Sequence, residues 1–297
     1  MKKSKTVLLT GGTGFLGSNL LRKLIAADYN VVLLVRRSSN FSNIADMLDK
    51  VTLLYSEDAD FGSLFAKNRI DCIVHCATNY GRKGQLPLAI LDSNLILPLK
   101  LLQIGAENGL KCFINTDTVL GMNISHYSLS KAQFKEWLKI YSGRLVCVNM
   151  ALEHFYGPGD DESKFVTWII RGLLKQSKSI DLTSGDQKRE FIYIDDVVDA
   201  FLRVIKSAVS LNNGYIPYEI GAEKSVKIRE FVILVKSLMK NSRTRLNFGA
   251  IPYRKGEILE HKTDLAGIKK LGWKARIPLT TGLRKTITSE RSLLRKE

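Results

Sequence analysis

A tyrosine and a lysine in the segment Tyr127-Ser128-Leu129-Ser130-Lys131 have the types and the spacing for proton transfer. Four residues apart on a helix, the two side chains share one face and can act together. A nearby ammonium favours the phenolate form of a tyrosine, which brings its pKa of about 10 closer to working pH. Such a tyrosine can protonate a carbonyl oxygen. The pair also occurs by chance, so it does not establish a site alone.

Thr116 lies eleven residues before Tyr127, at the end of the apolar segment Cys112-Phe113-Ile114-Asn115. The segment predicts a buried strand, and ligands of open α/β sheets bind at the carboxyl ends of strands. A hydroxyl there can orient a carbonyl group and stabilise negative charge developing on its oxygen. A threonine that merely ends a strand is the structural alternative, but the order Thr, Tyr, Lys favours a catalytic set.

A glycine-rich turn lies near the start of the chain, in Thr10-Gly11-Gly12-Thr13-Gly14-Phe15-Leu16-Gly17. It separates a predicted strand over residues 6–10 from a predicted helix over 15–27. The first two glycines allow a tight turn, Gly14 lets the backbone approach a pyrophosphate, and Gly17 lets helix and strand pack closely. Because the N-terminus of a helix favours anions, the turn predicts a dinucleotide site.

The second predicted strand, over residues 30–35, ends in Val35-Arg36-Arg37-Ser38-Ser39. An acidic residue at this place would accept hydrogen bonds from the ribose of NAD and repel a 2′-phosphate. Val35 replaces that acid, and two guanidinium groups that can bind phosphate follow it. We therefore predict NADPH as the cofactor, with two solvated arginines beside NAD as the alternative.

Strands and helices continue to alternate along the first half of the chain. Further strands are expected over residues 51–55, 72–76, 112–116 and 145–149, and helices over 92–107 and 128–141. This alternation predicts an α/β fold with a Rossmann-like, doubly wound parallel sheet. Beyond residue 157 the elements are shorter and mixed, with helices expected over 164–175 and 196–207.

Two domains are expected from this change of pattern. Residues 1–157 should form the NADP(H)-binding Rossmann domain with the catalytic residues. Residues 158–297 should form mainly a smaller substrate lobe, which is discontinuous because a strand and a helix near 190–207 return to the first domain.

The chain carries a formal net charge of +16, from 45 Lys and Arg against 29 Asp and Glu. Such a charge suits nucleic acid, an anionic membrane surface or phosphorylated small ligands. The basic residues are scattered, with no arginine-rich arm or zinc pattern, so a polyanionic cofactor and substrate are sufficient partners and no nucleic acid is expected. For the basic tail over residues 282–297, a solvated terminal helix is favoured over weak membrane contact.

The four cysteines, Cys72, Cys76, Cys112 and Cys147, fall in or beside apolar strand-like runs. None has a metal-ligand partner at useful spacing, so we expect buried free thiols in a reducing cytoplasm and no metal site. No apolar run approaches the roughly 20 residues of a membrane-spanning helix, and the lysine-rich start leads straight into a strand. We therefore expect a cytoplasmic protein with no signal peptide and no integral membrane association.

Taken together, these motifs resemble the extended short-chain dehydrogenase/reductase family, the NAD-dependent epimerase/dehydratase group of nucleotide-sugar enzymes. The resemblance covers nearly the whole chain. Besides the glycine-rich turn and the Thr116, Tyr127 and Lys131 set, it includes Asn94 in Asp92-Ser93-Asn94-Leu95, Tyr156-Gly157-Pro158-Gly159-Asp160, the run from Arg189 to Val197, and Arg254-Lys255-Gly256-Glu257.

Within that family the chain resembles the bacterial CDP-abequose and CDP-paratose synthases. These reduce carbon 4 of a CDP-4-keto-6-deoxyhexose with NADPH, for the O-antigen of lipopolysaccharide and related surface polysaccharides. The segments that carry this likeness are Ala77-Thr78-Asn79-Tyr80-Gly81-Arg82, Asn115-Thr116-Asp117, Leu152-Glu153-His154-Phe155-Tyr156-Gly157 and Leu271-Gly272-Trp273-Lys274.

The resemblance implies a role for each matching residue. Thr116, Tyr127 and Lys131 would be catalytic, and Tyr127 and Lys131 would also contact the cofactor. The other implied cofactor residues are Gly11, Gly14, Phe15, Leu16, Gly17, Ala77 and Asn94, with Arg36 and Arg37 at the 2′-phosphate. The implied substrate residues are Asn79, Asp117, His154, Lys164, Phe165, Arg189, Arg254 and Glu257.

Some positions depart from the family pattern or are ambiguous. His154 replaces a frequent asparagine and Ala151 a frequent arginine, so the sugar contacts stay open, and His154 is either a structural histidine or a substrate ligand. His75, inside an apolar strand, is expected in the core.

The reaction type follows from two further observations. In the family's dehydratases Asp117 would be followed by a glutamate base, but here Thr118 follows, so water elimination fits poorly. Epimerases and dehydratases recycle bound NAD, whereas a reductase exchanges NADPH with the cellular pool, so the arginine pair favours a reductase. An epimerase and a catalytically silent NADP(H)-binding regulator stay open, as do the nucleotide base and the stereochemistry at carbon 4. The resemblance also implies a homodimer, formed by the helices from Asp92 and from Ser128.

Overall fold

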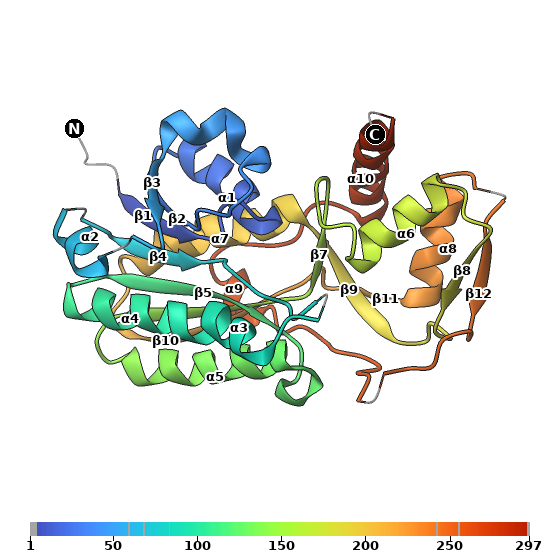
Figure 1. Cartoon of the computed structure of the whole chain (residues 1–297). Helices are drawn as coiled ribbons and strands as arrows, with labels where there is room; N and C mark the ends of the chain where they lie inside the picture. Colours follow the sequence, from blue (N-terminus) through green and yellow to red (C-terminus); the bar gives the residue numbers. More distant parts are fainter. Residues whose placement is uncertain are drawn as a thin grey trace. The chain divides into compact units, whose positions relative to one another are not determined.

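The computed structural model describes residues 5–58, 60–67, 69–82, 84–241, 243–254 and 256–295 (Figure 1). The chain divides into two compact units, each assembled from three segments. The first unit contains Met1–Leu152, Val198–Glu219 and Ala266–Trp273, and the second contains Glu153–Val197, Ile220–Leu265 and Lys274–Glu297. The chain thus passes between the units several times.

A seven-stranded sheet organises the first unit. Its strand order is β10-β6-β5-β4-β1-β2-β3, and the pairings from β6 through to β3 are parallel. The strands are β1 (Thr6–Thr10), β2 (Asn30–Val35), β3 (Thr52–Tyr55), β4 (Cys72–His75), β5 (Cys112–Thr118), β6 (Val146–Leu152) and β10 (Gly214–Ile220). The order reverses at β1, so β1 and β4 form a switch point of the kind where ligands bind. The predicted Rossmann-like fold class is confirmed.

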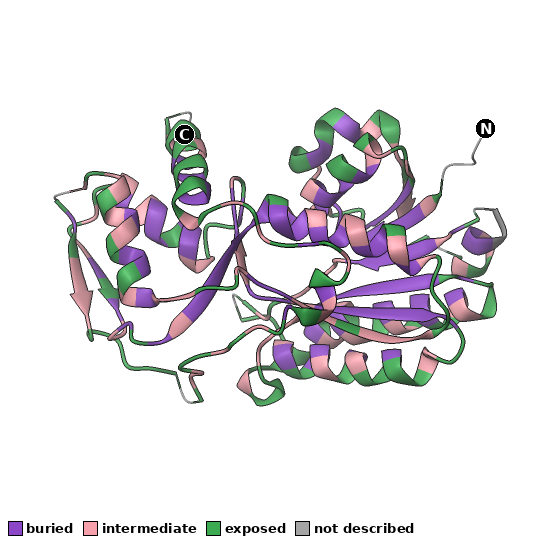
Figure 2. Cartoon of the chain, turned by 180° about the vertical axis from the view of Figure 1, so that it is seen from behind, coloured by how far each residue is buried: buried purple, intermediate pink, exposed green. Residues whose placement is uncertain are grey.

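Helices cover both faces of this sheet, α1 and α7 on one side and α4 and α5 on the other (Figure 1). The helical segments are α1 (Phe15–Ala26), η1 (Ser42–Lys50), α2 (Phe61–Lys67), α3 (Pro87–Leu91), η2 (Asp92–Ile96), α4 (Leu97–Glu107), η3 (Met122–Ile124), α5 (His126–Tyr141), α7 (Ile194–Ala208) and α9 (Ala266–Lys269). Leu101 and Phe134 pack into a core cluster with strand residues such as Leu8 and Phe113. Buried positions follow the strands and the inner faces of the helices (Figure 2).

The helix expected from residue 92 begins earlier. Pro87 occupies its first turn, where a proline is tolerated because its missing N–H would have no helical partner. Residues 92–96 form a π-helical segment that carries Asn94 inward. Together Pro87–Glu107 is long and apolar enough to cross a membrane by length and composition, with 33% of its best window buried. The prediction from the sequence rested on uninterrupted apolar runs, and polar residues interrupt this segment. Core helices of soluble proteins can have the same length and composition.

The second unit has two small sheets and three longer helices. One sheet has the order β11-β9-β7, with β9 (Lys188–Tyr193) parallel to β7 (His154–Tyr156) and antiparallel to β11 (Ser225–Lys227). The other pairs β8 (Ser179–Leu182) with β12 (Arg245–Phe248) in parallel. The helices are α6 (Phe165–Leu174), α8 (Ile228–Leu238) and α10 (Leu279–Leu294). A stack of Phe191 on Phe231, with centroids 3.9 Å apart, lies between sheet and helix.

The C-terminal tail corrects one expectation. It forms α10 as a helix, but one face of that helix is buried, including Gly282, Leu283 and Ile287, so it is not simply solvated. A Cβ at Gly282 would collide with the Tyr156 hydroxyl, which explains the need for glycine there. All four cysteines are free, with Cys76 half-buried and the others buried. Within the described residues no group of His, Cys, Asp and Glu side chains could hold a metal ion.

Candidate active site

The glycine-rich turn leaves room for a ligand at the start of α1. Gly11 has a φ of 68°, and a Cβ there would lie 2.5 Å from the amide nitrogen of Ala77. A Cβ on Gly17 would overlap the carbonyl oxygen of Gly11. Gly14 begins α1 without a side-chain cap, and the first turn contains no acidic residue. The backbone N–H groups of that turn, including Phe15 and Leu16, can therefore serve an anion, so these residues fit a dinucleotide pyrophosphate.

Polar contacts join the carboxyl ends of β1 and β4 beside this turn. The Thr10 hydroxyl lies 2.8 Å from Nδ1 of His75 and accepts a hydrogen bond from the Ala77 amide at 3.1 Å. His75 is fully buried, which confirms its expected core position, and burial lowers its pKa. It is therefore neutral at neutral pH and holds the two strand ends together.

The two arginines after β2 have different environments. The Arg37 guanidinium pairs with Asp58 and lies 5.2 Å over the Tyr55 ring. Arg36 is exposed, its amide donates to the Ser39 hydroxyl at 3.0 Å, and none of the described carboxylates pairs with its guanidinium. Both lie where a 2′-phosphate would be expected, but only the Arg36 guanidinium is without an ion-pair partner in this structure.

The proposed catalytic residues lie on β5 and on α5. The ammonium of Lys131, which is 1% exposed, donates to the Thr116 carbonyl oxygen at 2.8 Å. The Thr116 hydroxyl lies 3.4 Å from Sγ of Cys76. A reciprocal capping box between Ser125 and Ser128 begins α5, and Tyr127 follows in its first turn. The structure therefore brings Thr116 and Lys131 into contact, with Tyr127 one helical turn before the lysine.

Burial dominates the protonation of this site. It raises the pKa of Tyr127 well above its usual value, an effect opposed by a hydrogen bond from Thr118. This shift is opposite to the one expected from Lys131, because loss of solvation is its main cause, and the cation that opposes it is Arg82. Burial also lowers the pKa of Lys131 to about 8, although Asp117 acts in the opposite direction. The phenol is protonated at neutral pH and can act as a proton donor.

Replacing Lys131 with Met should change how stability depends on pH. The folded pKa of Lys131, about 8, lies below the ordinary 10.5, so between these values the unfolded chain binds more protons and stability rises with pH. Between pH 7 and pH 10, the free energy of unfolding of the wild type should therefore rise by roughly 2 kcal/mol more than that of Lys131→Met. Urea titrations across this range measure it.

The exposed Lys139 on the same helix supplies the control, and Lys139→Met should follow the wild-type pH profile. Parallel pH profiles of the wild type and Lys131→Met would show that the lysine titrates normally.

Asp117 is held by protein groups. One oxygen accepts the Thr118 amide at 2.8 Å, and the other accepts Nδ2 of Asn149 at 2.7 Å. Asn149 in turn accepts Nδ2 of Asn115 at 2.8 Å. This amide pair connects β5 to β6, and the sequence reading did not single out Asn149. The predicted sugar contact of Asp117 would have to share a carboxylate that already accepts two hydrogen bonds.

The loop after β4 is hydrogen-bonded to the π-helical segment. The Asn94 amide accepts the Asn79 backbone N–H at 2.8 Å and donates to the Asn79 carbonyl at 2.9 Å and to the Ser130 hydroxyl at 3.0 Å. It thus orders the loop next to α5. On this loop the Tyr80 ring lies 5.0 Å from the Tyr127 ring, with Arg82 5.0 Å over Tyr80. The sequence pattern alone predicted no role for Tyr80.

Three predicted substrate residues meet in the second unit. The buried Arg189 pairs with one oxygen of Glu257, and Nε of Arg254 lies 3.1 Å from the other. Glu257 therefore bridges two arginines that would otherwise repel each other.

The other two predicted substrate residues of this unit, Lys164 and Phe165, have separate partners. Lys164 pairs with Asp160 at 2.9 Å. Phe165 packs against Phe191 and Phe231, so it belongs to the aromatic core of this unit.

His154 belongs to a histidine pair that shares one carboxylate. Its Nδ1 lies 3.1 Å from Glu153, whose other oxygen lies 2.8 Å from Nδ1 of His261. The Glu153 side chain is buried, whereas that of His154 is 38% exposed. The sequence reading missed Glu153 and His261 as partners, since His261 is 108 positions away and belongs to no motif.

Comparisons with known proteins extend these observations. A model of the NAD dependent epimerase/dehydratase family matches residues 7–221. CDP-abequose synthase of Salmonella muenchen is 33% identical, covering 96% of this chain and 98% of its own length. A putative UDP-glucose 4-epimerase of Methanocaldococcus jannaschii is 24% identical, over 95% of this chain and 97% of its own.

Solved structures share the fold. UDP-glucose 4-epimerase of Thermotoga maritima, determined with UDP-glucose, has a TM-score of 0.84 at 23% identity, covering 97% of this chain and 99% of that one. UDP-glucuronic acid 4-epimerase of Bacillus cereus, in complex with UDP-glucuronic acid and NAD, has a TM-score of 0.83 at 19% identity, with 97% and 99% covered. The chain therefore belongs to the NAD-dependent epimerase/dehydratase family of nucleotide-sugar enzymes.

Proposed function

We propose that this protein reduces the 4-keto group of a nucleotide-linked 4-keto-6-deoxyhexose with NADPH, and that the nucleotide is CDP. The observation that carries the proposal is the placement of Thr116 on β5 and of Tyr127 and Lys131 on α5, with the buried Lys131 bonded to the Thr116 carbonyl, in a chain 33% identical to a CDP-abequose synthase. A reduction needs a proton donor beside the keto oxygen, and the phenol of Tyr127, which is protonated at neutral pH, meets that need.

In this mechanism Tyr127 donates its proton to the keto oxygen. A bound nicotinamide cofactor supplies the hydride that the carbonyl carbon accepts. Thr116 orients the oxygen through its hydroxyl and stabilises the charge that develops on it. Lys131, fixed to the Thr116 carbonyl, holds the cofactor ribose and stabilises the phenolate left on Tyr127.

Each unit has its own part in this proposal. The first unit binds the dinucleotide, through the turn from Gly11 to Gly17 and through Arg36 and Arg37. The second unit binds the nucleotide diphosphate through Arg189 and Arg254. The two guanidinium groups carry two positive charges and the Glu257 carboxylate between them only one negative charge, so a net positive charge is left for the diphosphate. Free cysteines fit a reducing compartment, so we propose that the enzyme works in the cytoplasm.

Two other reactions in the family are less well supported. Thr118 stands where a dehydratase would need a glutamate base, and a threonine hydroxyl cannot serve as that base near neutral pH. An epimerase keeps its NAD and consumes none, and the arginines after β2 favour an exchangeable NADPH. A silent regulator would have no reason to retain the buried lysine beside Thr116.

Exposed apolar side chains on α5 and near α4 support a homodimer. Trp137 and Ile140 are 39% and 69% exposed, and Ile96 is 40% exposed. Burying such a surface in a second copy of the chain would remove it from water. We propose this surface as the dimer interface, and sedimentation equilibrium should give twice the chain mass; a monomer at micromolar concentration would contradict it.

Oxidation of NADPH by purified protein tests the proposed reaction. CDP-4-keto-6-deoxyglucose, generated enzymatically, is the first substrate, with the dTDP and GDP analogues in parallel and product analysis afterwards. Stoichiometric oxidation with one nucleotide is the expected result. Conversion of a nucleotide sugar without NADPH consumption would favour an epimerase instead, and tight NADPH binding without turnover of any analogue would favour the regulator.

A further inference from the structure

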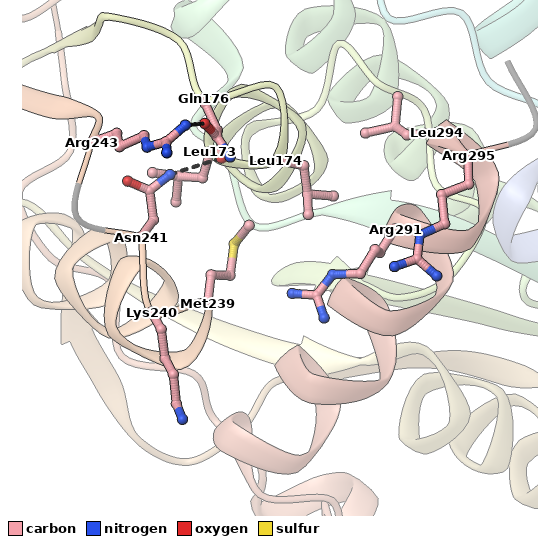
Figure 3. Close-up of a pocket in the computed structure, with 10 residues that line it drawn as sticks. All are labelled: Leu173, Leu174, Gln176, Met239, Lys240, Asn241, Arg243, Arg291, Leu294 and Arg295. Carbon is pink, nitrogen blue, oxygen red and sulfur yellow. Dashed lines mark hydrogen bonds between the residues drawn. The ribbon is translucent and has the colours of Figure 1, made fainter.

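A pocket in the second unit lies apart from every residue discussed above as part of the reaction. It is formed where α6, α8 and α10 end, and its volume is about 510 Å³ (Figure 3). This volume lies within the roughly 300–1,000 Å³ usual for small-molecule sites. The lining residues are Leu173, Leu174, Gln176, Met239, Lys240, Asn241, Arg243, Arg291, Leu294 and Arg295.

The charged side chains of this pocket all have the same sign. Lys240, Arg243, Arg291 and Arg295 line it, and no acidic residue does. Within the described part of the chain, no carboxylate pairs with any of the four. Glu162, just before α6, and Glu290, on α10, instead pair with Arg171. All four side chains are exposed, so water screens their mutual repulsion, and an anion that joined them would reduce it further.

Helix dipoles explain only part of this charge. Three helix C-termini meet here, and cations stabilise such ends by small amounts. However, the Leu173 carbonyl at the end of α6 already accepts Nδ2 of Asn241 at 2.8 Å and the Gln176 amide at 3.2 Å. At the end of α6, this carbonyl is therefore satisfied within the chain and does not need the pocket cations.

The backbone at two lining positions supports a role for their side chains. Gln176 and Lys240 follow the ends of α6 and α8 with φ of 53° and 52°. Glycine is the usual residue in this left-handed position because a Cβ is strained there. Both positions instead carry long polar side chains, and the Gln176 amide oxygen accepts the Arg243 guanidinium at 2.6 Å. This contact orients one cation of the pocket (Figure 3).

We propose that this pocket binds a phosphate group attached to a small apolar portion. The cations suit a phosphate, and Leu173, Leu174, Met239 and Leu294 offer an apolar wall beside them. A membrane phospholipid headgroup and a free phosphorylated metabolite share this chemistry. The site does not depend on the proposed keto reduction, because none of its residues belongs to that machinery.

Charge reversal at the pocket tests the proposal, with NADPH and CDP both present at saturation so that the proposed cofactor and nucleotide-diphosphate sites are filled. The pocket variant is Lys240→Glu with Arg291→Glu. The control is Lys206→Glu with Arg284→Glu, which makes the same change of charge at exposed positions, one of them on α10. One arm titrates inorganic pyrophosphate by calorimetry. The other measures sedimentation with phosphatidylcholine vesicles, with and without phosphatidylglycerol.

The expected result is that binding in one arm falls at least about tenfold in the pocket variant and is retained by the control. Loss in the pyrophosphate arm identifies a free phosphate ligand, and loss only in the vesicle arm identifies a lipid headgroup. Equal weakening in both variants, or no binding in either arm, overturns the proposal. If the pocket variant fails to fold by circular dichroism, the neutral Arg291→Gln with Arg295→Gln variant takes its place and should lose binding in the same arm.

Discussion

Tyr127→Phe should lower turnover of the keto-sugar nucleotide by roughly 10²- to 10⁴-fold while leaving NADPH affinity nearly unchanged. The phenolic hydroxyl is the proposed proton donor, and phenylalanine removes it while keeping the ring that packs against Tyr80. NADPH oxidation measures turnover, and fluorescence titration with NADPH measures binding.

Tyr141 on the same helix offers a matched control, and Tyr141→Phe should retain full turnover. If Tyr127→Phe turns over at the wild-type rate, the proton comes from elsewhere and the catalytic assignment fails. A large loss of NADPH affinity in that variant would instead point to a structural role for the hydroxyl.

Replacing Arg36 with Asp and Arg37 with Asn should weaken NADPH by about 10²-fold relative to NADH. A charged hydrogen bond contributes roughly 1.5–3 kcal/mol, and only NADPH carries the 2′-phosphate that these guanidiniums would bind. Dissociation constants for both cofactors measure the ratio. Equal weakening of NADPH and NADH would show that the arginines do not recognise the 2′-phosphate.

The single variants refine this prediction. Arg37 is already paired with Asp58, whereas Arg36 has no described carboxylate partner, so Arg36→Ala should cost more NADPH affinity than Arg37→Ala. The exposed Arg22, which pairs with Asp46 at 2.5 Å, is the control site, and Arg22→Ala should leave the ratio of the two affinities unchanged.

The local sequence pattern was sufficient to predict the strands on either side of the phosphate-binding turn and its helix. The apolar runs over residues 6–10 and 30–35 become β1 and β2 with the predicted bounds, since period and turn residues act within a few positions. Where a local signal is ambiguous, boundaries shift. The helix expected at residue 92 begins at Pro87, and the one expected at 196 begins at Ile194.

The fold class, the family and the order of the chemical groups along the chain follow from the amino-acid sequence, because spacing on one helix or one turn is a property of neighbouring residues. The burial, pKa and partners of those groups depend on how distant segments pack. Packing around Tyr127 raises its pKa, and a contact across 108 positions joins Glu153 to His261. Tertiary packing also places the cations of the pocket, which come from separate helix ends, next to one another. Solvation and long-range contact exist only once distant segments pack, so no local pattern encodes them.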